Sequence, residues 1–146
     1  MMAVERSAKA TWEGELIGGS GEVSTESGVV QSATVNWSSR AEQADENTSP
    51  EELIAAAHAT CVSMALANGL AQAGTPATKL ESDATATFDK TSDGFRLTTM
   101  RLSVRGQVDG LDEEGFRRAA EDAKENCPVS QALKGNVEVT LDAELA

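Results

Sequence analysis

The sequence predicts an α+β protein with mostly antiparallel β-sheet and one long, buried helix. Two segments, residues 78–90 and 100–105, alternate apolar and polar side chains, which is typical of strands with one buried face. Residues 8–37 are rich in Gly, Ser and Thr and hold β-forming residues between turn signals. Residues 50–74 are apolar along nearly their whole length and open with helix-start signals. Strands and helices grouped in this way favour an α+β architecture.

Length and composition limit the possible functions. The 146 residues suit one domain, residues 1–146. A formal net charge of -12 repels phosphate backbones and anionic lipids, so we expect neither nucleic acid nor a membrane as a partner. Aromatic residues make up only 3%, so the core must come largely from Ala, Val, Leu and Ile. Residues 1–6 turn polar at once and lack the apolar run of a signal peptide, which predicts a cytoplasmic protein.

The first part of the chain is expected to form a three-stranded antiparallel meander. The β-forming residues of segment 8–37 are separated by two turn signals, Gly18-Gly19-Ser20-Gly21 and Ser27-Gly28. Residues 38–48 (SSRAEQADENT) are polar and lack apolar periodicity, which predicts a surface loop. Arg40 is the only basic residue of this loop.

The long helix is predicted to begin at Pro50. Ser49 suits the N-cap, Pro50 suits the first helical position, and Glu52 completes a capping box. Gly74 marks the end of the helix. Polar residues such as His58 interrupt the apolar run, so a buried central helix fits better than a membrane span. Apolar residues lie on nearly every face, and one small chain covers such a helix with difficulty, which indicates dimerisation.

A hairpin is predicted after the long helix. The strand over residues 78–90 leads into a turn at residues 91–94, and an antiparallel mate follows. On this mate, Met100, Leu102 and Val104 alternate with polar residues, which gives it one buried face.

Two helices and a last strand complete the chain. Asp112 is expected to cap an amphipathic helix over residues 113–125. Pro128 is excluded from a helix interior but suits a first helical position, so Cys127 becomes the N-cap of a short helix. Alternation over residues 137–143 predicts the final strand. The expected order of elements is therefore β-β-β-α-β-β-α-α-β.

The two cysteines are the first candidates for chemistry. In a reducing compartment, metal binding or redox chemistry is a better use for such a pair than a structural disulfide. Cys61, on the buried helix, fits either an inert core thiol or a reactive one. At a helix N-cap, Cys127 would lie near the positive end of a helix dipole, which lowers the pKa of a thiol. His58, one turn before Cys61, fits a base, a metal ligand or a hydrogen-bonded core residue.

Taken together, the motifs resemble a known family. The segments TSPEELIAAAHATCVSMAL around Cys61 and ENCPVSQAL around Cys127, with the openings WEGEL and GEVSTESG, are similar to the OsmC-type branch of the OsmC/Ohr peroxidases over nearly the whole chain. The resemblance implies an OsmC-like fold and an intertwined homodimer with the long helices at its centre. It also implies reduction of organic hydroperoxides, and more weakly of hydrogen peroxide, in defence against oxidative or osmotic stress.

The resemblance assigns roles to four residues. Cys61 corresponds to the peroxidatic cysteine, which becomes a sulfenic acid, and Cys127 to the resolving cysteine, which closes a Cys61-Cys127 disulfide. Arg40 and Glu51 correspond to the family's loop arginine and to the first glutamate of the helix. A small or protein-bound dithiol, of lipoyl type in the family, would restore the thiols. No metal, haem or flavin cofactor is expected.

Two departures and two alternatives accompany this assignment. The family commonly has Phe where this chain has Ala41 and Val62, so the preferred hydroperoxide is left open. One alternative is a redox sensor that signals through the same disulfide and turns over slowly. The other is a small zinc-binding or ligand-binding module that uses His58, Cys61 and Cys127.

Overall fold

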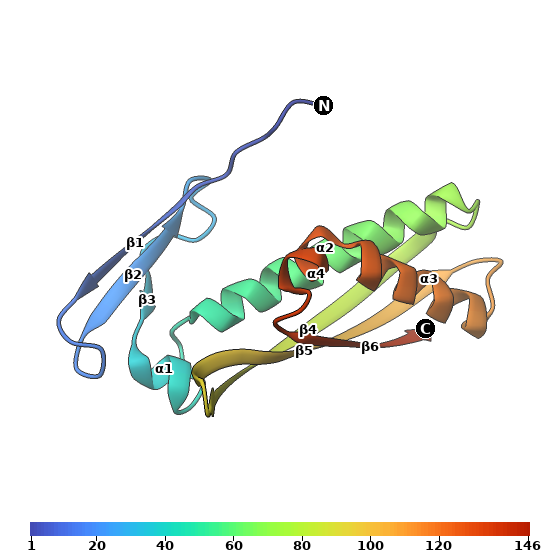
Figure 1. Ribbon diagram of the computed structural model, residues 1–146. Coiled ribbons are helices and arrows are strands. Elements are labelled where there is room, and N and C mark those ends of the chain that lie inside the picture. Colours follow the sequence, from blue (N-terminus) through green and yellow to red (C-terminus); the bar gives the residue numbers. More distant parts are fainter. The chain divides into compact units, whose positions relative to one another are not determined.

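The computed structural model describes all residues, 1–146, as an α+β protein with two compact units. The N-terminal unit is Met1–Pro50 and the C-terminal unit is Glu51–Ala146. Each unit contains its own three-stranded sheet (Figure 1). Three of the four strand pairings are antiparallel, which confirms the predicted fold class.

The N-terminal unit is the predicted antiparallel meander, with strand order β1-β2-β3. Its strands are β1 (Ala8–Glu13), β2 (Ser20–Thr25) and β3 (Ala33–Val35). Gly21, opposite Trp12 in the register, is the only buried residue of this unit. The N-terminal unit therefore has almost no core of its own.

The segment expected to be a surface loop begins instead with a short helix, α1 (Trp37–Ala41). The side chain of Asn36 accepts a hydrogen bond from the backbone N–H of Ser39 at 2.8 Å and so caps this helix. The loop prediction was wrong for these residues because the cap, a local side-chain bond, forms without any apolar periodicity. Arg40 lies in the last turn of α1.

The C-terminal unit places three helices on one face of its sheet. The sheet has the order β4-β5-β6, with strands β4 (Ala77–Thr91), β5 (Gly94–Val108) and β6 (Glu138–Leu145). Helices α2 (Pro50–Gln72), α3 (Glu113–Asn126) and α4 (Pro128–Leu133) cover the same face, as Figure 1 shows. Strands β4 and β5 form the predicted hairpin, whereas β6 runs parallel to β5 because α3 and α4 carry the chain back between them.

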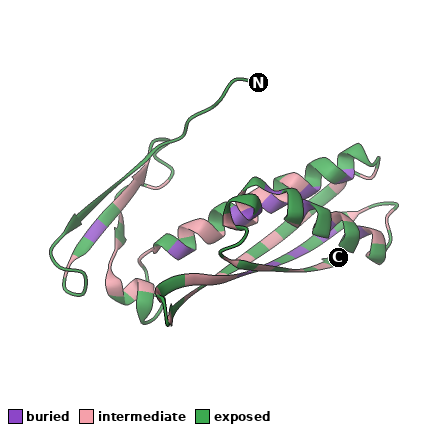
Figure 2. Cartoon of the chain, in the orientation of Figure 1, coloured by how far each residue is buried: buried purple, intermediate pink, exposed green.

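The core of the C-terminal unit lies between the helices and β5 (Figure 2). The residues that alternate on β5 are buried as predicted, and so is the inward face of α3. The buried apolar side chains of these elements are Val62, Leu66, Leu70, Met100, Leu102, Val104, Phe116, Ala120 and Ala123. Cys127 belongs to the same core.

Helix α2 buries one stripe and exposes apolar residues elsewhere. Its buried stripe, Val62, Leu66 and Leu70, repeats every four residues and faces the core. Met64 is 68% exposed, and several alanines on the same helix are exposed too. The helix is long and apolar enough to cross a membrane by length and composition. Its packed stripe makes it the core helix of the C-terminal unit, which is compatible with a soluble protein.

The start signals of the other helices act as predicted. The Oδ1 atom of Asp112 accepts a hydrogen bond from the Gly115 N–H at 2.8 Å and caps α3. Pro128 is the first residue of α4, and Cys127 is its N-cap. Gly74, after the end of α2, has a φ of 85°, the left-handed conformation that glycine tolerates best.

Glycine at position 106 allows α3 to approach the sheet. A Cβ atom on Gly106 would lie 2.5 Å from the ring of Phe116, which is fully buried. We therefore expect Gly106→Ala to lower the free energy of unfolding by about 1–3 kcal/mol, because the ring has no free space to enter. Urea unfolding measures this change. Gly69→Ala is the matched control, since its Cβ meets no atom within 4 Å, and equal stability of both variants would contradict the packing argument.

Candidate active site

The structure brings the two cysteines together. Asn126 ends α3, and Pro128 is excluded from the interior of a continuing helix, so the chain turns at Cys127. This turn places the Cys127 side chain against Cys61 of α2, near enough for each thiol to act on the other. Both thiols are free; Cys127 is fully buried and Cys61 is half-buried. The Cys127 side chain does not cap α4, so its sulfur remains available to Cys61.

The surroundings of Cys61 favour its neutral thiol. Burial raises the pKa of Cys61 above its ordinary value, and the hydrogen bond with Cys127 raises it further. The backbone N–H of Val129 donates to the sulfur and acts in the opposite direction. No cation contributes to this balance. A reactive thiolate at Cys61 therefore needs a positive charge that the surroundings of Cys61 in the C-terminal unit do not supply.

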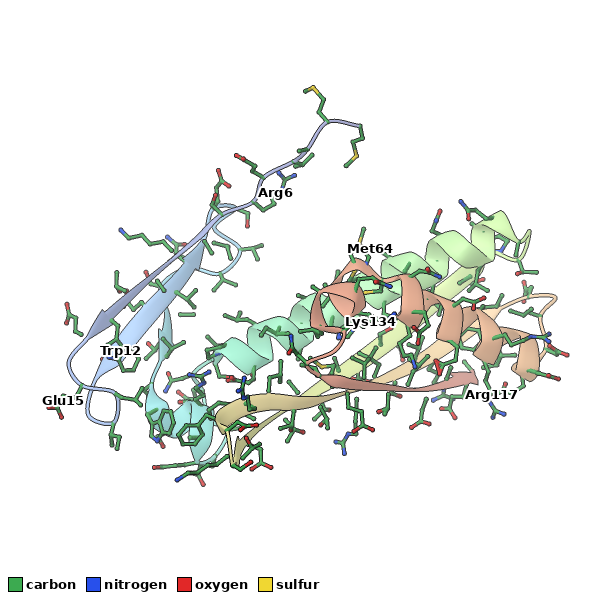
Figure 3. All side chains as sticks on the ribbon, viewed as in Figure 1. Arg6, Trp12, Glu15, Met64, Arg117 and Lys134 are labelled. Atoms are coloured by element: carbon green, nitrogen blue, oxygen red, sulfur yellow. The ribbon has the colours of Figure 1, made fainter.

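Cys61 opens into a groove of about 890 Å³ between α2, α3 and the start of α4, which we call the thiol groove. Met64, one turn after Cys61, lines this groove and projects away from the sheet (Figure 3). The lining of the groove includes the apolar residues Ala65, Ala119 and Pro128 and polar residues such as Arg118 and Asn126. Val62, one of the two departures from the family pattern, points into the core and does not line the groove.

His58 and Ser130 form a second contact between α2 and α4. The Nε2 atom of His58 lies 2.7 Å from the Ser130 Oγ atom, and both residues are buried. The Nδ1 atom of His58 is buried and has no hydrogen-bond partner. The ring is therefore a core residue with only one of its two nitrogens satisfied.

Burial also lowers the pKa of His58 below its ordinary value of 6.5. Below pH 6.5 the unfolded chain binds a proton at His58 that the folded chain does not, so the free energy of unfolding falls as the pH falls. We expect this loss to approach at most about 1.4 kcal/mol per pH unit. Urea unfolding between pH 7 and 5 measures it, and His58→Gln should show a shallower slope than wild type. Equal slopes would contradict the buried neutral ring.

Arg40 belongs to a different unit from the thiol pair, and Glu51 lies at the opposite end of the first half of α2 from Cys61. Arg40 belongs to the N-terminal unit, where it lines a pocket of about 330 Å³. The other lining residues of this pocket are Trp12, Leu16, Val35, Asn36, Trp37 and Pro50. Glu51 is buried in the first turn of α2. It is separated from Cys61 by about 15 Å along the helix axis, so these two residues of one chain do not meet.

The zinc alternative gains no support from the geometry. The chain has no group of three or more His, Cys, Asp or Glu side chains placed to hold a metal ion. The nitrogen of His58 that has a polar partner contacts Ser130 rather than either thiol. The arrangement near Cys61 is that of a dithiol pair.

Sequence reasoning missed two residues near the thiol pair and one residue beside Arg40. Ser130 and the N–H of Val129 act near the thiol pair, and the only available signal was their position just after Cys127-Pro128. Trp37, which lines the pocket beside Arg40, was counted only as the end of the meander. Its place beside Arg40 follows from α1, the helix that was not expected.

Three comparisons relate this chain to known proteins. Peroxiredoxin OsmC of Escherichia coli (strain K12) is 42% identical over 144 residues, which cover 99% of each chain. Organic hydroperoxide resistance protein OhrA of Bacillus subtilis (strain 168) is 33% identical over 107 residues, 70% of this chain and 72% of that protein. The crystal structure of OhrB of Bacillus subtilis has a TM-score of 0.74 at 27% identity, covering 94% of this chain and 98% of that one.

The family model of the OsmC-like proteins matches residues 43–142, which is more than half of the chain and includes both cysteines. The relatives named above agree with this match in sequence and in fold. The chain therefore belongs to the OsmC-like protein family.

Proposed function

We propose that this protein reduces organic hydroperoxides, with Cys61 as the attacking residue and Cys127 as the resolving residue. Its relatives indicate a cysteine-based peroxidase. Two relatives support this class of substrate: one is called a peroxiredoxin, and the other is called an organic hydroperoxide resistance protein. The observation that carries the proposal is the contact between the Cys61 and Cys127 side chains at a groove. Two free thiols in contact, one of them accessible, are what a two-cysteine peroxidase requires.

The first step oxidises Cys61. Its thiolate attacks the terminal oxygen of the hydroperoxide, the O–O bond breaks, and the alkoxide leaves and takes up a proton to become an alcohol. Cys61 is oxidised to a sulfenic acid, and the peroxide is reduced by the same two electrons.

The second step closes the disulfide. Cys127 attacks the oxidised sulfur of Cys61, the S–O bond breaks, and the oxygen leaves as water with the proton of the Cys127 thiol. An external dithiol then reduces the Cys61-Cys127 disulfide by thiol-disulfide exchange and is itself oxidised. The contact between the two thiols makes this closure an intramolecular reaction over a short distance.

Arg40 supplies the positive charge that the first step needs. Its guanidinium holds the Cys61 thiolate and the charge that grows on the leaving oxygen, and Glu51 orients the guanidinium. Support comes from the raised pKa of Cys61, which burial and Cys127 cause and which no cation offsets. The apolar pocket beside Arg40 supports an organic substrate, because it can receive a hydrocarbon group next to a polar head.

The site is shared between two protomers of an intertwined dimer. The N-terminal unit buries only Gly21, and α2 exposes apolar side chains such as Met64. A second chain that packs against the N-terminal unit and against the exposed side of α2 would bury these surfaces. Glu51 and Cys61 of one chain lie about 15 Å apart along α2, so Arg40 can engage both most readily when they come from different chains. We therefore expect Arg40 and Glu51 of one protomer to serve Cys61 of its partner.

Mixing two impaired variants tests the shared site. Cys61→Ser subunits retain Arg40, and Arg40→Met subunits retain Cys61, so a heterodimer of the two contains one complete site. We expect activity to return after subunit exchange, with one working site in each heterodimer. Sedimentation measures the assembly and hydroperoxide consumption measures the activity. An active monomer, or no recovery despite proven exchange, would contradict the shared site.

Turnover separates an enzyme from a sensor. With excess cumene hydroperoxide and a dithiol such as dihydrolipoamide, we expect many turnovers for each protein chain. A protein that forms its disulfide once and is then reduced only slowly would be a redox sensor. Metal analysis of the purified protein tests the zinc alternative in the same preparation.

A further inference from the structure

The thiol pair and a second polar contact join the start of α4 to α2. His58 and Cys61 are one turn apart on α2, and Cys127 and Ser130 are one turn apart at the start of α4. Cys61 lies beside Cys127, and the Nε2 atom of His58 lies 2.7 Å from the Oγ atom of Ser130. The first turn of α4 is thus held against α2 at two points, one of which is the reacting pair.

Backbone hydrogen bonds to α3 and α4 hold Cys127 in place. Its N–H donates to the carbonyl of Ala123 at 2.8 Å, and its carbonyl accepts from the N–H of Gln131 at 3.0 Å. Cys127 is therefore tied to the last turn of α3 and to the first turn of α4. No side-chain cap fixes its sulfur, so the position of the sulfur depends on where α3 and α4 hold the backbone of Cys127.

His58 occupies its position at an energetic cost. Its Nδ1 atom is buried without a hydrogen-bond partner, so the folded chain bears the desolvation cost of a hydrogen bond that is not made. An apolar side chain of similar volume would avoid this cost but would lose the bond to Ser130. The cost is explained if the bond to Ser130 has a function beyond filling the core.

We propose that the hydrogen bond between His58 and Ser130 positions Cys127 for its attack on oxidised Cys61, and so sets the rate of disulfide closure. This inference rests on the proposed function. To form a disulfide the two sulfurs must approach to about 2.0 Å, with little tolerance in the Cβ positions. Slow closure would leave the sulfenic acid of Cys61 exposed to a second peroxide, which oxidises it to a sulfinic acid. His58 and Ser130 are positioning residues, since neither lines the thiol groove.

Single-turnover kinetics with cumene hydroperoxide test this role. A sulfenic acid trap and intact mass give two rates, that of Cys61 oxidation and that of disulfide closure. For Ser130→Ala we expect oxidation to stay within about twofold of wild type and closure to slow by about tenfold or more, because small displacements of reacting groups have effects of this size. Excess peroxide should then convert more of Cys61 to the sulfinic acid.

Two substitutions of His58 separate the hydrogen bond from the volume of the ring. His58→Met fills the space without a bond and should close as slowly as Ser130→Ala. In His58→Gln the side-chain amide nitrogen can take the place of Nε2, so closure should return toward the wild-type rate. The His58 pair and the Ser130 variant are independent tests, so either suffices if the other fails to fold.

Ser82→Ala is the matched control. The Ser82 hydroxyl on β4 accepts a hydrogen bond from Ser63 of α2 at 2.6 Å, so its loss loosens α2 without touching α4. We expect normal closure in this variant. Equally fast closure in Ser130→Ala and His58→Met, no rescue by His58→Gln, or equal slowing in Ser82→Ala would overturn the positioning role alone. A wild-type protein that forms no disulfide would overturn the proposed function, and this inference with it.

Discussion

Replacing Cys61 by Ser is expected to abolish hydroperoxide consumption, whereas Cys127→Ser should still consume about one equivalent. A serine hydroxyl in place of the Cys61 thiol is too weak a nucleophile to break the O–O bond at neutral pH. Without Cys127, Cys61 still reacts but stops as a sulfenic acid or a higher oxide. Peroxide loss and the mass of the oxidised peptide measure both outcomes.

The two variants also decide between two assignments of the cysteines. The position of Cys127 at a helix N-cap suggests a reactive thiol, whereas the family pattern assigns the attack to Cys61. The structure leaves Cys127 fully buried and Cys61 half-buried at the thiol groove, which favours Cys61 as the residue that peroxide reaches. An inert Cys127→Ser and an oxidisable Cys61→Ser would reverse the roles.

Replacing Arg40 by Met is expected to raise the pKa of Cys61 and to slow its reaction with hydroperoxide by about tenfold or more. Burial and Cys127 already raise the pKa of this thiol, so its thiolate depends on an added cation. The pH dependence of Cys61 alkylation, measured in the Cys127→Ser background, gives the shift. The alkylation rate of Arg40→Met should rise only at higher pH than that of the matched background.

Two further variants make this test specific. Arg40→Lys should rescue poorly, because an ammonium lacks the planar fork that engages a sulfur and a carboxylate together. Arg118→Met removes the same charge from a residue that lines the thiol groove but does not act on the pKa of Cys61. It should leave alkylation unchanged. If Arg40→Met behaves like Arg118→Met, Arg40 is only a surface charge.

Local signals predicted most of the fold. Helix α2 begins at Pro50 and ends shortly before Gly74. Both signals are local, because a proline at the first helical position and a glycine with positive φ after the last turn affect only the neighbouring residues. Asp112 caps α3 for a similar local reason. Local signals could not predict that β6 pairs in parallel with β5, because this pairing depends on the path that α3 and α4 give the chain.

The sequence was enough to identify the two cysteines of the site, but not the contacts around them or the direction of the Cys61 pKa shift. Motifs singled out Cys61 and Cys127, and the structure brings them together. The contact of His58 with Ser130 joins residues 72 positions apart, and no local pattern indicates it. The direction of the pKa shift at Cys61 depends on burial, which the sequence does not specify. The roles of Arg40 and Glu51 stay predictions, because the proposed site takes these two residues from a second protomer.

The most direct test is the intact mass of the wild-type protein after one equivalent of cumene hydroperoxide. The two-cysteine mechanism predicts the loss of two hydrogen atoms from each chain and, after digestion, one peptide pair joined through Cys61 and Cys127. The loss should reverse on addition of a dithiol. An unchanged mass under these conditions would contradict the peroxidase and every other redox account of the two thiols.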